Sequence, residues 1–145
     1  MDSSFLTALY PIHPKLVHFP IALVISAMGM QALGLLLKKD SLCKGAWLMF
    51  VLAVIAIPIV ILSGLSEANR LNLHHPILTL HKQFAFAAMW LSLIALPVLW
   101  FMRVKNNKFF QIMFLIVLFL LSSLVGLAAH QGGRMVYESG VGVSQ

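Results

Sequence analysis

The sequence is poor in charge. Among its 145 residues, ten are Lys or Arg and four are Asp or Glu, whereas about a quarter of the residues of a soluble domain are charged. So few charged side chains cannot cover a water-facing surface, and the 61% hydrophobic content excludes a disordered chain. The composition therefore predicts an integral membrane protein, with the lipid bilayer as its main partner.

Cysteine is nearly absent as well, because Cys43 has no second cysteine to pair with, and this excludes a disulfide scaffold. The net charge is +6, but the basic residues do not gather in one patch or helix, so nucleic acid is not an expected partner. No nucleophile–base pair, CxxC motif, glycine-rich phosphate loop or internal repeat rises above background. The sequence thus favours an electron-transfer or accessory subunit over a stand-alone enzyme.

Long charge-free windows predict the fold. A hydrocarbon core about 30 Å thick needs roughly 20 helical residues, and the windows span residues 16–37, 45–66, 83–102 and 109–133. We predict a single all-α domain, residues 1–145, that forms an integral membrane four-helix bundle. Its expected segments are helices at about 16–37, 45–66, 83–102 and 109–130 and a glycine-rich tail, 131–145, folded over the outer face.

The basic residues predict the orientation, because cytoplasmic loops carry an excess of Lys and Arg. The short loops after the first and third helices hold six of them: Lys38, Lys39, Lys44, Arg103, Lys105 and Lys108. The opposite side holds four in longer segments: Lys15, Arg70, Lys82 and Arg134. Both termini are therefore expected on the non-cytoplasmic side, which faces the periplasm if the protein resides in a bacterial inner membrane.

All six histidines fall on that same outer side: His13, His18, His74, His75, His81 and His130. Histidine is the commonest metal ligand and titrates near neutral pH. His74 and His75 fit an interfacial role, with His75 entering a helix before Pro76. The others are candidate ligands.

Helical spacing strengthens the case for three of these histidines, because residues at i, i+4 and i+7 share a helix face. Three stripes of small residues lead inward from histidines. Ala22, Ser26 and Gly29 follow His18; Ala85, Ala88 and Ser92 follow His81; and Gly126 and Ser122 precede His130. Such faces let membrane helices pack closely, and they also leave room for a flat macrocycle beneath a histidine ligand. Glu67 shares a face with Ser63 and is either a partner that orients an imidazole or a helix-terminal group in water.

Three segments resemble a bacterial membrane family known as domain of unknown function 2231. His13–Leu23 is similar to its HPxxVHFPIAL signature, and Ser63–Ala68 resembles its sGllDA segment, with Glu67 in place of the usual acid. His130–Val143 resembles HxGGxLVYxHGVGV, except that Ser139 stands where the pattern has a second histidine. The resemblance covers nearly the whole chain. It implies a four-helix membrane protein that works beside c-type cytochrome or Rieske-type redox domains.

These observations lead to the hypothesis of a membrane b-type cytochrome, in which histidines on facing helices bind one or two haems. His18, His81 and His130 are the expected axial ligands, and His13 is the fourth candidate. Arg70 and Arg134 are expected to bind the haem propionates. Electrons would pass to a redox partner on the outer side.

Two other interpretations remain open at this stage. His18, His81, His130 and Glu67 are also a candidate site for Zn, Cu or Fe, and another tetrapyrrole fits the same histidines. Alternatively, the chain is a non-catalytic accessory subunit of a larger membrane redox or pigment complex.

Overall fold

The computed structural model describes residues 12–73, 75–104, 107–138 and 140, and all the regular secondary structure in this part of the chain is helical. The elements are α2 (His13–Leu16), α3 (His18–Leu37), α4 (Asp40–Arg70), α5 (Pro76–Arg103) and α6 (Lys108–Tyr137). Four segments are long and apolar enough to cross a membrane, and α2 and α3 together form the first of them. The prediction of an all-helical protein with four candidate spans is confirmed.

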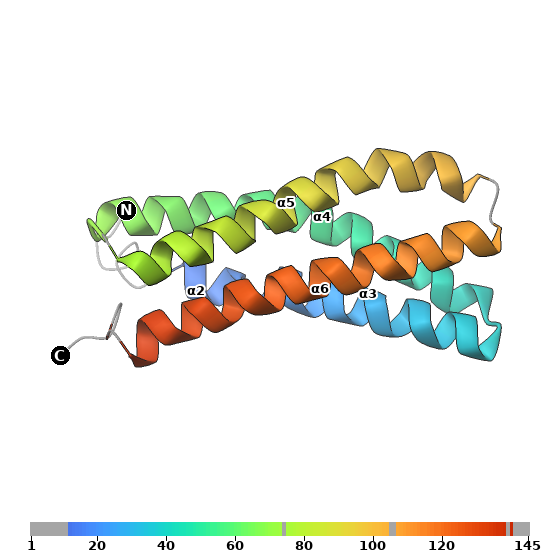
Figure 1. Ribbon diagram of the computed structural model, residues 1–145, viewed down its shortest axis with the longest axis horizontal. Coiled ribbons are helices and arrows are strands. Elements are labelled where there is room, and N and C mark those ends of the chain that lie inside the picture. The colour runs from blue at the N-terminus through green and yellow to red at the C-terminus, as the bar shows by residue number, and fades with distance from the viewer. Residues whose placement is uncertain (1–11, 74, 105–106, 139, 141–145) are drawn as a thin grey trace, which may run out of the picture.

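The helices run alternately up and down, as Figure 1 shows. Each packs against the next along the chain, and α6 closes the ring by packing against α3. The bundle therefore has two distinct ends. We call the end where α2 begins, α4 ends, α5 begins and α6 ends the histidine end, and the opposite end, which carries Lys38, Lys39, Lys44, Arg103 and Lys108, the lysine end.

Local sequence explains where the helices begin and break. The first helical segment is interrupted at Val17, between α2 and α3. The cause is Pro20, which has no N–H to donate to the carbonyl of Leu16 and whose ring crowds that oxygen. At the lysine end, Lys38 adopts a left-handed conformation with φ 53° and stops α3. The next helix, α4, then begins after Lys39.

The helices extend beyond the charge-free windows. The longest, α4, has 31 residues, which is about 46 Å at 1.5 Å per residue and exceeds the hydrocarbon thickness. The expected and observed boundaries differ most near the C-terminus. A non-helical tail is expected from residue 131, but α6 continues to Tyr137. Gly132 and Gly133 disfavour a helix, but the segment packs on its neighbours and buries Met135 beside Ala68 and Leu78.

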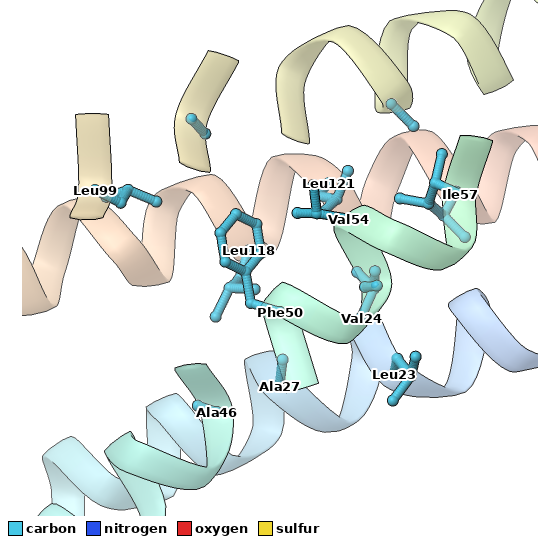
Figure 2. Packing of buried hydrophobic residues seen from close by; sticks show 14 of the residues in the cluster. Leu23, Val24, Ala27, Ala46, Phe50, Val54, Ile57, Leu99, Leu118 and Leu121 are labelled. Carbon is cyan, nitrogen blue, oxygen red and sulfur yellow. The ribbon is translucent and has the colours of Figure 1, made fainter. Parts of the chain in front are cut away.

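The core runs along the bundle axis. Val24, Phe50, Phe114, Leu118 and Leu121 are at most 1% exposed, and Figure 2 shows the labelled members of this group converging from three helices. Helices in lipid associate through close packing because the surrounding lipid tails are as apolar as the core. Large apolar side chains on the outside of the bundle fit the same environment, since they would face those tails.

The fold predicts a large difference between two phenylalanine truncations. Phe50→Ala leaves a cavity in the core and should lower the free energy of unfolding by about 3 kcal/mol. Phe101→Ala, at a side chain 76% exposed, should change it by less than about 1 kcal/mol. Thermal unfolding of the detergent-purified variants measures both effects. Equal losses would contradict the packing described here.

Candidate functional site

Five histidines are described, and all lie toward the histidine end of the bundle. This agrees with the expectation from sequence that the histidines share one side. His74 lies outside the described residues. The structure brings two of the five together, His13 from α2 and His81 from α5, and these two rings form the centre of the candidate site.

His13 is held against α4. Its Nδ1 lies 3.1 Å from the carbonyl oxygen of Val60 and 3.0 Å from Oγ of Ser63. The Ser63 hydroxyl itself donates to the Val60 carbonyl at 2.7 Å. Because a carbonyl oxygen only accepts hydrogen bonds, the proton of the imidazole sits on Nδ1, and Nε2 keeps its lone pair.

His81 is held against α6 in the same manner. Its Nδ1 donates to the carbonyl oxygen of Ala128 at 2.8 Å, which again leaves Nε2 with the lone pair. The inward stripe below it is buried as predicted, with Ala88 2% and Ser92 0% exposed. The α5 stripe therefore does face the bundle interior.

Two glycines make these contacts with the backbone carbonyls accessible. Gly64 follows Val60 by four residues and Gly132 follows Ala128 by four, so each lies one helical turn beyond the carbonyl that a histidine binds. A Cβ on Gly64 would lie 2.7 Å from Cε1 of His13, and a Cβ on Gly132 would lie 3.6 Å from Cε1 and Nδ1 of His81. At Gly64 the absence of a side chain lets the His13 ring lie against the backbone, whereas a Cβ at Gly132 would touch the His81 ring only at ordinary van der Waals distance.

The two rings lie close and nearly perpendicular. Their centroids are 6.2 Å apart and their planes meet at 88°. In the neutral form with the proton on Nδ1, each imidazole offers the lone pair of Nε2. The site thus combines two basic nitrogens with fixed tautomers, one from each half of the chain.

His18 and His130 do not join this pair, contrary to the expected set of His18, His81 and His130. Both side chains are exposed, and Nδ1 of His18 donates to the Pro14 carbonyl of its own segment at 3.0 Å. The stripe of Ala22 and Ser26 below His18 is exposed too. The three stripes share one helical spacing in the sequence, but that spacing does not indicate which stripe faces inward, because packing against neighbouring helices sets the rotation of each helix.

His75 has a structural role. It precedes Pro76 at the start of α5, and its side chain accepts a hydrogen bond from the backbone N–H of Ile77 at 3.2 Å. It is therefore the N-cap of α5, which agrees with the helix-entry role predicted for it.

Two ion pairs at this end join residues that are three or four positions apart along the chain. Glu67 accepts from Arg70 at 2.8 Å near the end of α4. Arg134 donates to Glu138 at 2.9 and 3.0 Å and to Gln131 at 3.3 Å. The hydrogen bonds from Arg134 lower the pKa of the Glu138 carboxyl. Glu67 thus lies near the end of α4, where its carboxylate is engaged by Arg70 of the same helix.

No group of three or more His, Cys, Asp or Glu side chains that could hold a metal ion occurs in the described part of the chain. Ser139, where the family pattern has a further histidine, lies outside that part. The donors that do gather are the two imidazoles of His13 and His81.

A buried polar contact that sequence reasoning missed lies toward the other end of the bundle. The Gln31 side chain is fully buried and its Nε2 donates to Oε1 of Gln111 at 2.6 Å and to the Gln111 carbonyl at 3.2 Å. Nearby, the Arg103 guanidinium lies 4.9 Å from the centre of the Trp47 ring. These contacts tie α3 to α6 and α4 to α5 near the lysine end.

Fold and site together define a four-helix membrane bundle with a pair of histidines at one end. The chain belongs to the family described as "Predicted membrane protein (DUF2231)", whose model matches residues 9–145. This confirms the resemblance seen in the sequence. Neither a curated protein nor a solved structure matches the chain.

The glycine contacts generate a prediction. Gly64→Ala should displace the His13 ring and lower the free energy of unfolding by about 1–3 kcal/mol, the usual cost of overpacking. Gly132→Ala adds a methyl group at ordinary contact distance and should be neutral or stabilising by up to about 1 kcal/mol, because alanine is the better helix former. Thermal unfolding in detergent measures both changes.

Gly29→Ala is the matched control, since a Cβ at Gly29 would meet no atom within 4 Å. If Gly64→Ala changes the free energy of unfolding no more than Gly29→Ala does, the His13 ring does not lie in close contact with α4.

Proposed function

We propose that this protein is a membrane-bound electron-transfer subunit that binds haem between His13 and His81. The observation that carries the proposal is the pair itself: two imidazoles, one from each half of the bundle, lie with their centroids 6.2 Å apart and with both Nδ1 atoms at backbone carbonyls. Histidines that ligate metals almost always donate their other ring N–H to such an oxygen, which fixes the tautomer and the ring orientation.

The separation of the rings supports a ligand shared by the two halves of the chain, since their centroids lie 6.2 Å apart.

The number of donors favours haem over a bare ion. A zinc site made by protein side chains takes three or four of them, and the described residues bring two imidazoles together. Haem needs only axial ligands from the protein because the macrocycle provides the other nitrogens. The residues present therefore fit haem through their donor chemistry.

The chain's own residues would hold and tune the group. His13 and His81 provide Nε2, while the carbonyls of Val60 and Ala128 keep those nitrogens unprotonated and raise their basicity. Ser63 adds a second hydrogen bond at His13 alone, which makes the two ligands inequivalent. When bound, haem supplies a one-electron iron couple whose potential depends on its axial ligands.

The surroundings of the histidine pair bear on three further parts of the proposal: the propionate contacts, the orientation in the membrane and the redox partner. Arg70 and Arg134 are both exposed enough to reach an anionic propionate, although each now holds a glutamate of its own helix. The basic loops support placement of the lysine end in the cytoplasm. The histidine end would then face the periplasm of a bacterial inner membrane, where a c-type cytochrome, Rieske-type or other redox partner exchanges electrons with it.

Substitutions of single histidines test the ligand pair. The protein purified from cells with an adequate haem supply should show a sharp α-band in the reduced-minus-oxidised spectrum. His13→Ala and His81→Ala should each lose that band or turn high-spin. His18→Ala and His130→Ala remove exposed imidazoles outside the pair and should keep it. Pyridine haemochrome quantification gives the haem content of each variant.

The controls separate the other interpretations. A wild-type spectrum without haem bands would sink the haem proposal. Stoichiometric metal that a chelator removes would then support a non-haem site, and colourless histidine variants that insert and assemble normally would support an accessory subunit. If His18→Ala loses the band while His13→Ala keeps it, the ligand pair is wrong.

A further inference from the structure

The two histidine contacts are built alike in the two halves of the chain. His13 binds the carbonyl of Val60, and His81 binds the carbonyl of Ala128, and in both cases 47 positions separate the histidine from its acceptor. Each acceptor lies in the second helix of a hairpin, α4 or α6, and each histidine lies at the start of the first.

The glycines follow the same rule. Each lies four residues beyond the carbonyl and against the ring of the bound histidine, Gly64 against His13 and Gly132 against His81. Histidine, acceptor and glycine of the second hairpin each lie 68 positions after their counterparts in the first. Three positions, joined by two contacts in each hairpin, share one offset, which is difficult to explain by chance.

The same offset relates further positions in the two hairpins. The helix α4 begins at Asp40 and α6 begins at Lys108, again 68 positions later. Core positions also match, since eight residues buried in the first hairpin have buried counterparts at that offset. These pairs are Pro20 and Ala88, Val24 and Ser92, Ala27 and Ala95, Gln31 and Leu99, Ala46 and Phe114, Phe50 and Leu118, Ala53 and Leu121, and Ile57 and Val125.

Helix-weakening residues fall at corresponding positions too. Gly29 in α3 corresponds to Pro97 in α5, and Pro58 in α4 corresponds to Gly126 in α6. The residue types differ, which is why no repeat is visible in the sequence, but both glycine and proline disfavour a helix interior. The likeness lies in backbone contacts and burial, and a comparison of side-chain identity does not detect it.

We propose that the chain consists of two copies of one helical hairpin, 68 positions apart, and that each copy contributes one equivalent half-site made of a histidine, a carbonyl and a glycine. The two half-sites meet at the His13–His81 pair. A ligand therefore binds between the copies with one imidazole from each. This inference rests on the proposed function only for the identity of the ligand, and it requires one haem per chain rather than two.

Exchange of equivalent segments in the full-length chain tests the duplication. In one graft, residues 125–132 are replaced by a copy of residues 57–64, which keeps a glycine at position 132. The matched control carries residues 58–65 instead, so that the glycine moves one position earlier and a leucine faces His81. The reverse graft places a copy of residues 125–132 at 57–64 and introduces no proline.

The first measurement needs no haem. Neutral histidine in water prefers the proton on Nε2, so the Nδ1–H form reports the carbonyl contact. ¹⁵N-histidine NMR of the detergent-purified chain, assigned with H13Q and H81Q variants, should show this form at His81 in the first graft, at His13 in the reverse graft, and not at His81 in the shifted control. The in-register grafts should also keep one haem per chain.

The outcomes are distinct. If the in-register grafts fold but lose the Nδ1–H form, if the shifted control keeps it, or if neither in-register graft folds, the two hairpins are not interchangeable and the duplication is overturned. Two haems per chain would overturn the shared site. If the wild-type chain binds no haem while the grafts behave as expected, the proposed function fails and the duplication stands.

Discussion

The site depends on a hydrogen bond from an imidazole Nδ1 to a backbone carbonyl inside a neighbouring helix. Such a carbonyl already accepts the helical N–H four residues later, and the side chain of that later residue normally covers it. Glycine at this position leaves room for the ring, which is essential at Gly64, where a Cβ would clash with His13, and less strict at Gly132, where it would make ordinary contact with His81. One bond thus fixes the ring orientation, the tautomer and the distance between two helices.

This bond also explains why helix packing and ligand geometry are inseparable here. His13 joins α2 to α4, and His81 joins α5 to α6. Each hairpin is therefore braced by its own histidine, while the contact between the two rings joins the hairpins. Polar groups near the membrane interior are costly unless they are satisfied, and these two histidines meet that requirement with backbone acceptors while each keeps a nitrogen for a ligand.

The sequence predicts the architecture well and the site in part. Charge-free windows were enough to place four spans because charge is expensive in lipid. They could not place the ends, since α6 continues past Gly132 and Gly133 through packing contacts rather than helix propensity. Among the expected ligands, His81 lies on an inward stripe as predicted, whereas His18 and His130 point outward. His13, the fourth candidate, is the partner of His81 because α2 packs against α4, where the Val60 carbonyl holds the His13 ring. The carbonyls of Val60 and Ala128 have no side-chain signature, so no sequence pattern could have identified them.

Low-temperature electron paramagnetic resonance of the oxidised, detergent-purified protein tests the central claim most directly. Axial imidazoles whose planes stand 88° apart should give a strongly anisotropic low-spin ferric signal, with an intensity equal to one iron per chain. A high-spin signal, the signal of parallel imidazole planes, or the absence of a haem signal from protein made with an adequate haem supply would contradict the assignment of His13 and His81 as a shared ligand pair.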